Sequence, residues 1–329
     1  MNTDVYKQNL EIVEKQLNLL NEIKKKYIIS DFNKKKSRMR RIYNILSMQY
    51  LEKTIQKPLL SFFGVNKVTK VKFENVYSSA SYPLQIELVT KERSETVLYK
   101  RAPDLRNDFT LLPIFEYLNY IHGLKAPTYN ILLIDESSAM IEILKGQPLS
   151  IEHISIFLDA QPEKQRIFLE CMAMCVVQTY LFGIGDRNND NFIVTNALEV
   201  FHIDFSFILG ADPKLFRSMI ENTIRIPTIL QYILKSDVIL EEEFKNIFIT
   251  FFLRIRQYKK KIVLLLDILE LHPIIKTKKL RKYFLKQLHL ELKDEKLVKF
   301  LIELLENGIN VKFNKWLDIS NQVGKFFRK

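Results

Sequence analysis

Cysteine is scarce in this sequence of 329 residues, and its scarcity excludes a disulfide-stabilised fold. The two cysteines, Cys171 and Cys175, lie inside one apolar run, FLECMAMCVVQTYLF. Free cysteines in such surroundings behave as small hydrophobic residues, so we expect both to be buried on one face of a helix. None of the five histidines has a second histidine at metal-ligand spacing, and the sequence therefore predicts no zinc site.

Long apolar runs without charge are also missing. No run reaches the roughly 18 apolar residues that a transmembrane helix needs, and the polar, amphipathic N-terminus does not resemble a secretory signal. Hydrophobic residues still make up 47% of the chain, which is enough for a large core. The formal net charge of +12 favours anionic partners, namely nucleotides, nucleic acids or acidic membrane surfaces.

The spacing of apolar residues changes near residue 67. Residues 5–57 have helical periodicity, interrupted at 33–41 by NKKKSRMRR, which fits a solvated loop or a binding patch. From residue 67, VTKVKFENVY, LQIELVTK and ETVLYKRA alternate apolar with polar residues and predict three strands, with a turn at RSE (93–95). We expect a helix over about 107–122 and two further strands in YNILLI and SAMIEILKG.

Helical patterns dominate the rest of the chain, with one interruption. The segment GDRNNDNFIVTNALEVFHIDF at 185–205 favours a β-hairpin, in which NFIV and EVFHIDF flank a turn at TNAL. The predicted fold class is therefore α+β, with a small antiparallel β-sheet that carries one helix, followed by a larger, mainly helical lobe. The expected boundaries are 1–60 for an N-terminal helical segment, 61–146 for the small lobe and 147–329 for the large lobe with the C-terminal helices.

The hairpin segment has a spacing of polar residues that suits phosphoryl transfer. Asp186 precedes Asn191 by five positions, as the catalytic Asp precedes the metal-binding Asn in protein kinases, and Asp204 follows on the next expected strand. One carboxylate can orient an attacking hydroxyl or accept its proton, while an amide oxygen and a second carboxylate can hold Mg²⁺ against phosphates. Lys100, at the end of an expected strand, offers a positive charge for the phosphates.

Asp, Asn and Gly also cluster in ordinary turns, so the spacing alone is weak evidence. The acid, the amide, the second acid and the upstream strand lysine occur together and in the order that a kinase requires. Their combination favours kinase chemistry and a two-lobed, protein-kinase-like fold.

The same residues lie in segments that resemble the phosphatidylinositol 3-/4-kinase superfamily. GIGDRNNDN…FHIDFSFILG is similar to its catalytic and metal-binding loops, whose usual form is GDRHxDN…HIDFG. VLYKRAPDLRND resembles the region of its phosphate-binding lysine, and VYSSASYPLQIEL resembles its phosphate-covering loop. FILGADPKLF and the C-terminal region resemble class III, the vacuolar protein-sorting type of phosphatidylinositol 3-kinase. The resemblance extends over nearly the whole chain, although residues 1–60 resemble only the segment before the kinase lobes.

The resemblance implies roles in catalysis and metal binding. Asp186 would orient or deprotonate the inositol hydroxyl, with Asn188 beside it in the catalytic loop. Asn191 and Asp204 would ligate Mg²⁺ or Mn²⁺. Arg187 is expected to be structural and to pair with a nearby acid, and His202 to be packed and hydrogen-bonded.

It also implies positions for ATP and the lipid. Ordinary core packing predicts isoleucine at 193 and 203 equally well, so these two add little to the argument. The residues expected to contact ATP are Lys100 and Ser79 at the phosphates, Tyr129, Glu142 and Leu144 around the adenine, and Ile193 and Ile203 beneath it; Lys214 and Arg217 would line the substrate loop.

Three positions depart from the family pattern. Asn188 stands where the family has a histidine thought to help activate the lipid hydroxyl, and an amide cannot shuttle a proton, a contribution typically worth about 10²–10⁴-fold in rate. Ser206 replaces the glycine after Asp-Phe, which restricts the backbone beside Asp204. Asn119 replaces an acid that would pair with the lysine, and Glu116, one turn earlier, is a potential substitute.

The function implied is that of a lipid kinase that transfers the γ-phosphate of ATP to the 3-hydroxyl of phosphatidylinositol and gives phosphatidylinositol 3-phosphate. The few cations after Asp204 suit a headgroup with a single phosphodiester. The family further implies a cytoplasmic protein bound peripherally to endosomal or other endomembranes, and a kinase-like regulatory subunit. The C-terminal VGKFFRK fits either a membrane-binding helix end or a solvated terminus.

An alternative is a catalytically weak or dead pseudokinase that scaffolds an endomembrane complex, and the three departures motivate it. A protein kinase of the same superfamily is also possible, although the D-P-K loop favours a lipid substrate. The net charge permits nucleic-acid binding, but the sequence has no recognition motif and its cations are scattered over helices, so we expect no nucleic-acid partner.

Overall fold

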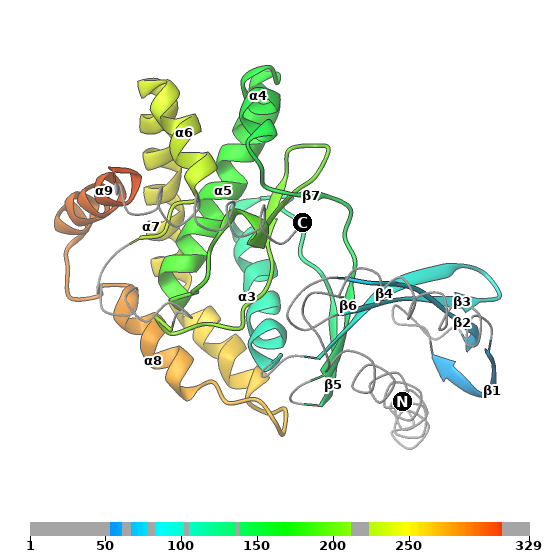
Figure 1. The fold of residues 1–329 in the computed structure, drawn as a ribbon. Coiled ribbons are helices and arrows are strands. Elements are labelled where there is room, and N and C mark those ends of the chain that lie inside the picture. Colours follow the sequence, from blue (N-terminus) through cyan, green and yellow to red (C-terminus); the bar gives the residue numbers. More distant parts are fainter. Residues whose placement is uncertain are drawn as a thin grey trace, which may run out of the picture. The chain divides into compact units, whose positions relative to one another are not determined.

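The computed structural model describes residues 53–60, 67–77, 83–101, 105–135, 138–211 and 224–310. They divide into two compact units. The first reaches to Arg106 and takes in Tyr129–Ile143; the second comprises Asn107–Thr128 and the described residues from Leu144 onward. The first unit is built on an antiparallel sheet and the second is mainly helical, so the fold class is α+β as predicted (Figure 1).

The sheet of the first unit has six antiparallel strands in the order β1-β2-β3-β4-β6-β5. On β3 and β4 every second residue is buried, because side chains of a strand alternate between its two faces. This alternation confirms the strands predicted in these segments. The strands are β1 (Lys53–Leu60), β2 (Lys67–Val76), β3 (Leu84–Thr90), β4 (Ser94–Arg101), β5 (Ile131–Asp135) and β6 (Ser138–Glu142).

Strand β1 corrects the prediction of helix up to residue 57. It forms the edge of the sheet, where the backbone of β2 offers hydrogen-bonding groups that helical periodicity in the sequence cannot reveal. The pairing shifts register between Thr54 and Leu59, a stretch that contains Pro58. Proline disrupts a helix interior but is tolerated in edge strands and at irregularities. Residues 1–52, the rest of the predicted helical segment, lie outside the described residues.

The turn between β3 and β4 also lies earlier than predicted. Val89 pairs with Ser94, and the backbone N–H of Thr90 donates to the carbonyl of Arg93 at 2.8 Å. The Thr90 hydroxyl oxygen accepts from the backbone N–H groups of Glu92 and Arg93 at 3.2 and 3.0 Å. A threonine hydroxyl can stabilise a turn in this way. Ser94 and Glu95, expected in the turn, therefore belong to β4.

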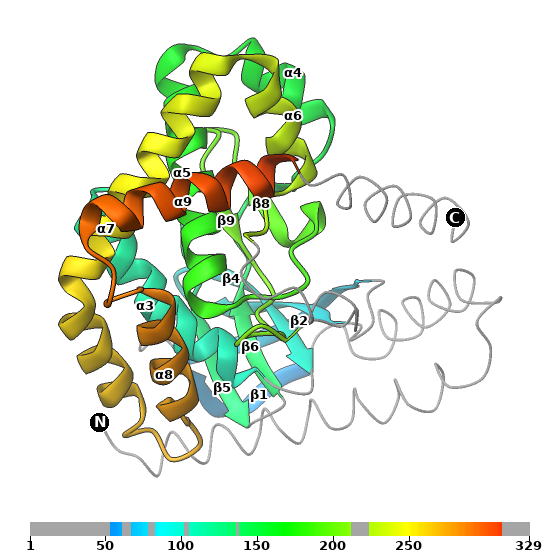
Figure 2. The same ribbon diagram turned by 90° about the vertical axis from the view of Figure 1, so that its left-hand side faces the viewer.

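Helix α5 forms the centre of the second unit. Every residue from Cys171 to Phe182 is buried, including the two free cysteines, because α7, α8 and β9 pack around the helix. Its C-terminus is closed by Gly183 in the left-handed conformation. The helices are α3 (Arg106–His122), α4 (Glu152–Leu158), α5 (Pro162–Phe182), α6 (Thr228–Ser236), α7 (Val238–Leu269), α8 (Lys278–Gln287) and α9 (Asp294–Asn310), of which α9 lies across α7 (Figure 2).

Helix α3 packs within the second unit. The ring of Phe115 lies 5.8 Å from that of Phe182, 5.0 Å from His202 and 5.3 Å from Phe205, measured between centroids. The sequence pattern suggested that this helix lies on the small sheet, whereas all but its first residue belongs to the helical unit. The lobe boundaries at residues 60 and 146 stay a prediction.

A small second sheet carries the segment with the expected catalytic residues. It consists of β7 (Gln147–Pro148), β8 (Phe192–Val194) and β9 (Val200–His202), in that order, with a 3-10 turn, η2 (Asn189–Asn191), before β8. Strands β8 and β9 form the predicted hairpin. Among the described helices, including α7 with its 32 residues, none is long and apolar enough to span a membrane.

Candidate active site

The β8–β9 hairpin brings the two expected metal ligands to one end of the small sheet. Phe192 pairs with His202, and the backbone N–H of Ile203 donates to the carbonyl of Asn191 at 3.0 Å. Asp204 therefore follows one residue beyond the partner of Asn191. Residues 13 positions apart in the sequence thus lie at the same end of the hairpin, which is the hairpin that the alternating pattern predicted.

The five-residue spacing between Asp186 and Asn191 closes a loop. The side-chain Nδ2 of Asn191 donates to the backbone carbonyl of Asp186 at 2.6 Å, and the backbone N–H of Asn188 donates to the same carbonyl at 3.0 Å. Because a carbonyl can only accept, this hydrogen bond assigns the nitrogen of the Asn191 amide. The amide oxygen is then the atom that can ligate a cation.

Both aspartates have a left-handed backbone. Asp186 has a φ of 50° and Asp204 a φ of 61°, a region that costs a residue other than glycine about 1–2 kcal/mol. Such strain persists only where the surrounding structure enforces it, and it is common at functional sites. Two sets of contacts hold this backbone: those of the Arg187 side chain, and those between the chain before Asp186 and the chain after Asp204.

Arg187 joins the catalytic loop to the backbone around Asp204. Its side chain is buried and donates to the carbonyls of Gly185 and Ile203, each at 2.9 Å, and to the carbonyl of Asp204. The guanidinium also lies 5.6 Å from the ring centroid of Phe205. These contacts give Arg187 a structural role through backbone carbonyls, which the sequence did not reveal, and the expected pairing with an acid stays a prediction.

The chain after Asp204 runs beside the chain before Asp186. The N–H of Gly185 donates to the carbonyl of Phe207 at 2.8 Å, and the N–H of Gly210 donates to the carbonyl of Gly183 at 2.9 Å. A Cβ atom on Gly185 would lie 2.1 Å from the carbonyl oxygen of Ala211. Only glycine permits this approach.

Ser206 hydrogen-bonds to the carboxylate expected to bind metal. Its hydroxyl donates to Oδ1 of Asp204 at 2.5 Å, and its backbone N–H donates to the same oxygen at 3.3 Å. The glycine usual at this position could supply only the backbone contact. The sequence identified the substitution, but not the bond that it makes.

His202 is buried beneath the hairpin among the rings of Phe115, Phe192 and Phe205. Neither of its ring nitrogens has a hydrogen-bond partner in the described part of the chain, so the expected hydrogen bond is wrong. Burial, with a smaller contribution from the charge of Arg187, lowers the pKa of His202 well below its usual range. The imidazole is therefore neutral and acts as a packing group.

Three of the expected nucleotide contacts lie in the first unit. Lys100 on β4 pairs with Ala139 on β6, and Glu142 pairs with Val97 across the same two strands. Oε2 of Glu142 accepts from the backbone and side-chain nitrogens of Asn130 at 2.9 and 2.8 Å, and this fixes the chain next to the buried Tyr129. The residue pattern of the sequence did not reveal this role of the Glu142 side chain.

The expected contacts beneath the adenine lie in the second unit. Ile193 and Ile203 are partly buried, and Leu144 precedes a close approach at Gly146, where a Cβ atom would lie 2.5 Å from Cγ2 of Ile193. This approach and the pairing of β7 with β8 bring the residues after Leu144 to the hairpin. Ser79, Lys214 and Arg217 lie outside the described residues.

Asn119, which replaces an expected acid, stabilises a loop of its own unit. Its Nδ2 donates to the carbonyl of Ala126 at 3.1 Å, and its backbone carbonyl accepts from the N–H of Leu124 at 2.9 Å. Glu116 on the same helix is exposed. The structure thus gives Asn119 a role in the connection after α3.

The donor set fits a divalent cation that shares its ligands with phosphates. Within the described ranges, no three His, Cys, Asp or Glu side chains come together as a metal site. An all-protein cage is not what phosphoryl transfer needs, because Mg²⁺ in such sites takes one or two carboxylates and completes its shell with phosphate oxygens and water. Asn191 and Asp204, hard oxygen donors at one end of the hairpin, match that arrangement.

An α+β fold that combines the Asp186–Asn191 loop, a following Asp204 and a strand lysine defines a kinase-like protein. The family described as phosphatidylinositol 3- and 4-kinase matches residues 10–278. The chain belongs to this family.

Individual relatives are similar at moderate identity. A protein of Encephalitozoon cuniculi named as a probable phosphatidylinositol 3-kinase VPS34 homolog is 25% identical over 336 residues, which cover 96% of this chain and 74% of that protein. Phosphatidylinositol 3-kinase VPS34 of Arabidopsis thaliana is 28% identical over 51% of this chain and 24% of its own length. The protein of the same name from Candida glabrata is 29% identical over 62% and 26%. The chain thus spans about a quarter of the plant and yeast relatives.

Proposed function

We propose that this chain is a lipid kinase that transfers the γ-phosphate of ATP to the 3-hydroxyl of phosphatidylinositol. The observation that supports the proposal most directly is the closed loop in which Asn191 donates to the carbonyl of Asp186 at 2.6 Å, with Asp204 at the end of the same hairpin. Membership of the family and the names of the relatives support phosphatidylinositol as the substrate and the 3-position as the acceptor.

The residues divide the chemistry between them. Asp186 orients the inositol hydroxyl and accepts its proton as the oxygen attacks the γ-phosphorus and the bond to ADP breaks. A Mg²⁺ or Mn²⁺ ion held by Asn191 and Asp204 would neutralise phosphate charge, and Lys100 would pair with the same phosphates. Tyr129, Glu142, Leu144, Ile193 and Ile203 would surround the adenine, with Ser79 over the phosphates and Lys214 and Arg217 at the lipid.

Asn188 supports the loop without carrying a proton. Its Oδ1 accepts from the backbone N–H of Asp190 at 3.0 Å, and its Nδ2 donates to Oδ1 of Asp186 at 3.5 Å. The second contact orients the carboxylate of Asp186. Asp186 is then the proton acceptor of the reaction, and the proposed enzyme works without the imidazole usual at position 188.

The proposal extends to the surroundings of the enzyme. Because the proposed substrate lies within a bilayer, we infer that the protein acts at the membrane surface, from the cytoplasmic side of endosomal or other endomembranes. The class III resemblance of the loop after Asp204 supports this location and a kinase-like regulatory subunit as partner.

The test is transfer of radiolabel from ATP to phosphatidylinositol vesicles in Mg²⁺ or Mn²⁺. Asp204→Ala and Asp186→Asn should reduce labelled 3-phosphate to background, while Asp159→Ala, which removes an exposed carboxylate outside the catalytic loop, should keep most of the activity. Label at another hydroxyl would contradict the 3-kinase assignment. ATP binding without any label would contradict catalysis and favour a scaffolding pseudokinase.

A further inference from the structure

Helix α7 exposes an apolar stripe near its C-terminal end. Leu264 is 57% exposed, Ile268 is 52% exposed and Leu271, just past the helix, is 82% exposed. Their spacing of four and three residues places them on one side of the helix. The N–H of Leu271 donates to the carbonyl of Ile268 at 3.1 Å and extends the last turn. A core-facing stripe of the same helix includes Ile262 and Leu266, which are fully buried.

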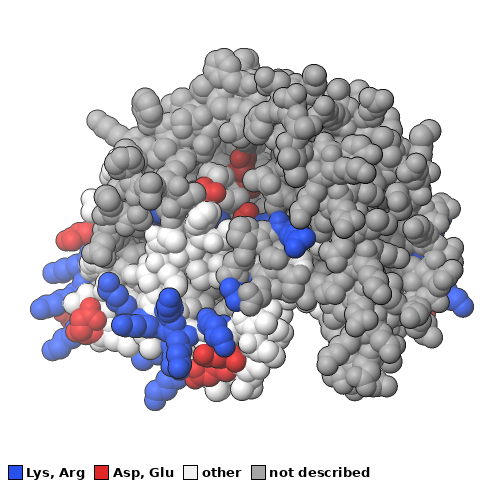
Figure 3. Space-filling view, turned by 60° about the horizontal axis from the view of Figure 1, so that its bottom comes forward, with Lys and Arg blue, Asp and Glu red and all other residues white. Residues whose placement is uncertain are grey.

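Exposed lysines precede and follow this stripe in the sequence. Residues 259–286 contain nine Lys or Arg and two acids. Both acids are bound within the segment: Asp267 to Arg281 at 2.7 Å, and Glu270 to the hydroxyl of Thr277 at 2.6 Å. Figure 3 shows Lys and Arg side chains gathered at the lower left of this side of the molecule, with Asp and Glu side chains among them. The α7–α8 face consists of the stripe Leu264, Ile268 and Leu271 and the exposed lysines Lys260, Lys261, Lys276, Lys278, Lys279, Lys282 and Lys286.

The opposite side of α8 packs against the base of the catalytic loop. The ring of Phe284 stacks on that of Phe182 with centroids 5.3 Å apart. A Cβ atom on Gly183 would lie 2.6 Å from the hydroxyl of Tyr283. Only Gly183 to Gly185 separate Phe182 from Asp186 in the chain. The α7–α8 face therefore belongs to the same packed body as the catalytic loop.

We propose that the α7–α8 face docks on a membrane surface rich in anionic lipids. The inference rests on the proposed function, because a lipid kinase must meet its substrate in a bilayer. Aliphatic side chains can enter the headgroup region while lysines around them attract anionic lipids, each worth about 1 kcal/mol near the surface. The charge of the face and that of such a membrane are complementary.

The composition of the face favours a membrane over a macromolecular partner. Protein interfaces are enriched in arginine and aromatic residues and depleted in lysine. Single-stranded nucleic acid is held by aromatic stacking and by arginine. On this face the cations are lysines, the apolar groups are aliphatic, and Arg281 is already paired with Asp267.

The test compares binding of the full chain to neutral phosphatidylcholine vesicles and to vesicles that also contain phosphatidylserine. Lys278→Glu/Lys282→Glu should weaken binding to the anionic vesicles by at least roughly 25-fold, since each lysine contributes about fivefold. Leu264→Ser/Ile268→Ser should weaken binding to the anionic vesicles several-fold and leave the salt dependence of that binding unchanged. Unfolding curves check that each variant is folded.

Matched controls come from the same unit. Val238→Ser/Ile239→Ser removes side chains that are 77% and 73% exposed at the other end of α7, and Lys164→Glu/Lys235→Glu reverses two exposed lysines elsewhere. Both controls should bind like the wild type. Equal losses in test and control variants, or no loss in either, would overturn the proposal, as would binding to nucleic acid or an acidic protein without binding to vesicles.

A second readout separates this inference from the proposed function. Phosphorylation of a short-chain, soluble phosphatidylinositol needs no docking, so the face variants should keep it at wild-type rate. Vesicle binding that depends on the face, without phosphorylation of any lipid, would retain the docking surface and reject the kinase. Phosphorylation of the lipid, with vesicle binding that the face variants do not change, would retain the kinase and reject the docking surface.

Discussion

At residue 206, the serine hydroxyl donates a hydrogen bond to one oxygen of Asp204, the carboxylate expected to bind metal. Ser206→Ala removes the 2.5 Å bond to Oδ1 of Asp204 but keeps the backbone N–H that orients the carboxylate. We expect Mn²⁺ to bind about fivefold more tightly in the presence of a non-hydrolysable ATP analogue, because one hydrogen bond is worth about 1 kcal/mol. Electron paramagnetic resonance of free Mn²⁺ measures this affinity. Ser206→Thr, which keeps the hydroxyl, is the control; weaker binding by the alanine variant would refute the argument.

At residue 188, an imidazole should increase turnover if the proposed function is correct. Asn188→His restores a group that can exchange a proton with the lipid hydroxyl, and we expect a gain of about tenfold or more in kcat. Asn188→Ser keeps an oxygen that can accept from the N–H of Asp190, as Oδ1 of Asn188 does now, but adds no base. The rate of phosphatidylinositol phosphorylation should therefore rise for histidine alone. A histidine variant no faster than the serine variant would show that this chain does not use a base there.

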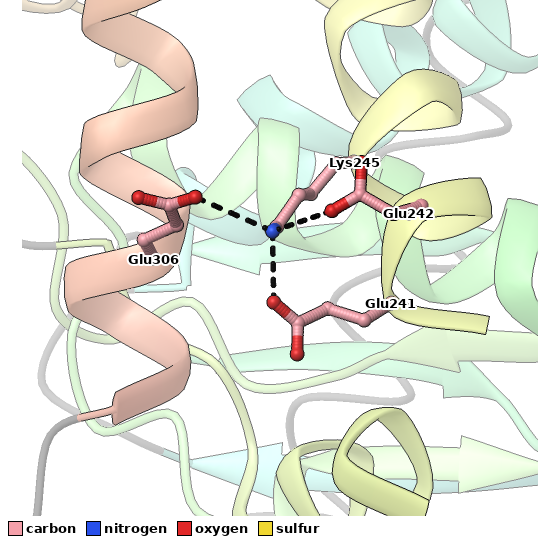
Figure 4. Close-up of polar contacts among 4 residues, drawn as sticks. All are labelled: Glu241, Glu242, Lys245 and Glu306. Carbon is pink, nitrogen blue, oxygen red and sulfur yellow. Dashed lines mark hydrogen bonds and ion pairs between the residues drawn. The ribbon is translucent and has the colours of Figure 1, made fainter. Parts of the chain in front are cut away.

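At the scale of elements, a buried lysine joins α7 to α9 (Figure 4). Nζ of Lys245 lies 2.8 Å from Glu241 and 2.9 Å from Glu242 on its own helix, and 3.5 Å from Glu306 on α9. Burial lowers the pKa of Lys245, but the hydrogen bonds to Glu241 and Glu242 outweigh it and raise the pKa overall. The lysine is therefore charged, and it offsets carboxylates that would otherwise repel each other.

Lys245→Met should therefore destabilise the second unit. Because the three carboxylates are partly exposed, the loss should be about 1–2 kcal/mol, below that of a fully buried ion pair. Urea unfolding measures it, with Lys260→Met, an exposed lysine of the same helix, as the control that should change little. Equal stabilities of the two variants would mean that the α7–α9 link contributes nothing.

The close approach of the chains before Asp186 and after Asp204 leads to a steric prediction at the same scale. Gly185→Ala would place Cβ 2.1 Å from the carbonyl oxygen of Ala211, so we expect a loss of about 3 kcal/mol and weaker nucleotide binding. Gly123→Ala meets nothing within 4 Å but has a φ of +67°, and should cost only about 1 kcal/mol. Unfolding and binding of an ATP analogue distinguish the two. Normal nucleotide binding by the Gly185 variant would contradict the idea that the close approach of these two chains positions the catalytic loop.

For the whole molecule, three buried or partly buried histidines predict sensitivity to acid. Burial lowers the pKa of His122, His153 and His202 below the ordinary value of 6.5. The unfolded chain therefore takes up protons near pH 6.5 that the folded chain does not, and the free energy of unfolding falls as the pH drops below that value. Urea unfolding at about pH 7.5 and about pH 5.5 should show the decrease.

His202→Phe should reduce that decrease, because phenylalanine does not titrate and the ring nitrogens of His202 have no hydrogen bonds to lose within the described residues. The aromatic surroundings of His202 can accept a phenyl ring. A variant with the same pH dependence as the wild type would show that His202 contributes nothing to it.

The sequence by itself determined the types of element and the chemical order of the site. Alternation on β3 and β4, the long apolar run of α5 and the Asp186–Asn191 interval are all features of neighbouring residues, so the sequence alone can reveal them. The turn at TNAL between two alternating segments likewise predicted the hairpin that brings Asn191 and Asp204 to one end.

Only the tertiary structure decided which distant groups meet. Four features depend on residues that are separated in the chain. They are the pairing of β1 with β2, the carbonyl partners of Arg187, the burial of His202 without a hydrogen bond among the described residues, and the exposed side of α7. A sequence pattern shows that a residue can be buried or can donate a hydrogen bond, but it does not show which residue it will contact. The partner is selected by packing of the whole unit, in which each buried surface and hydrogen bond excludes another.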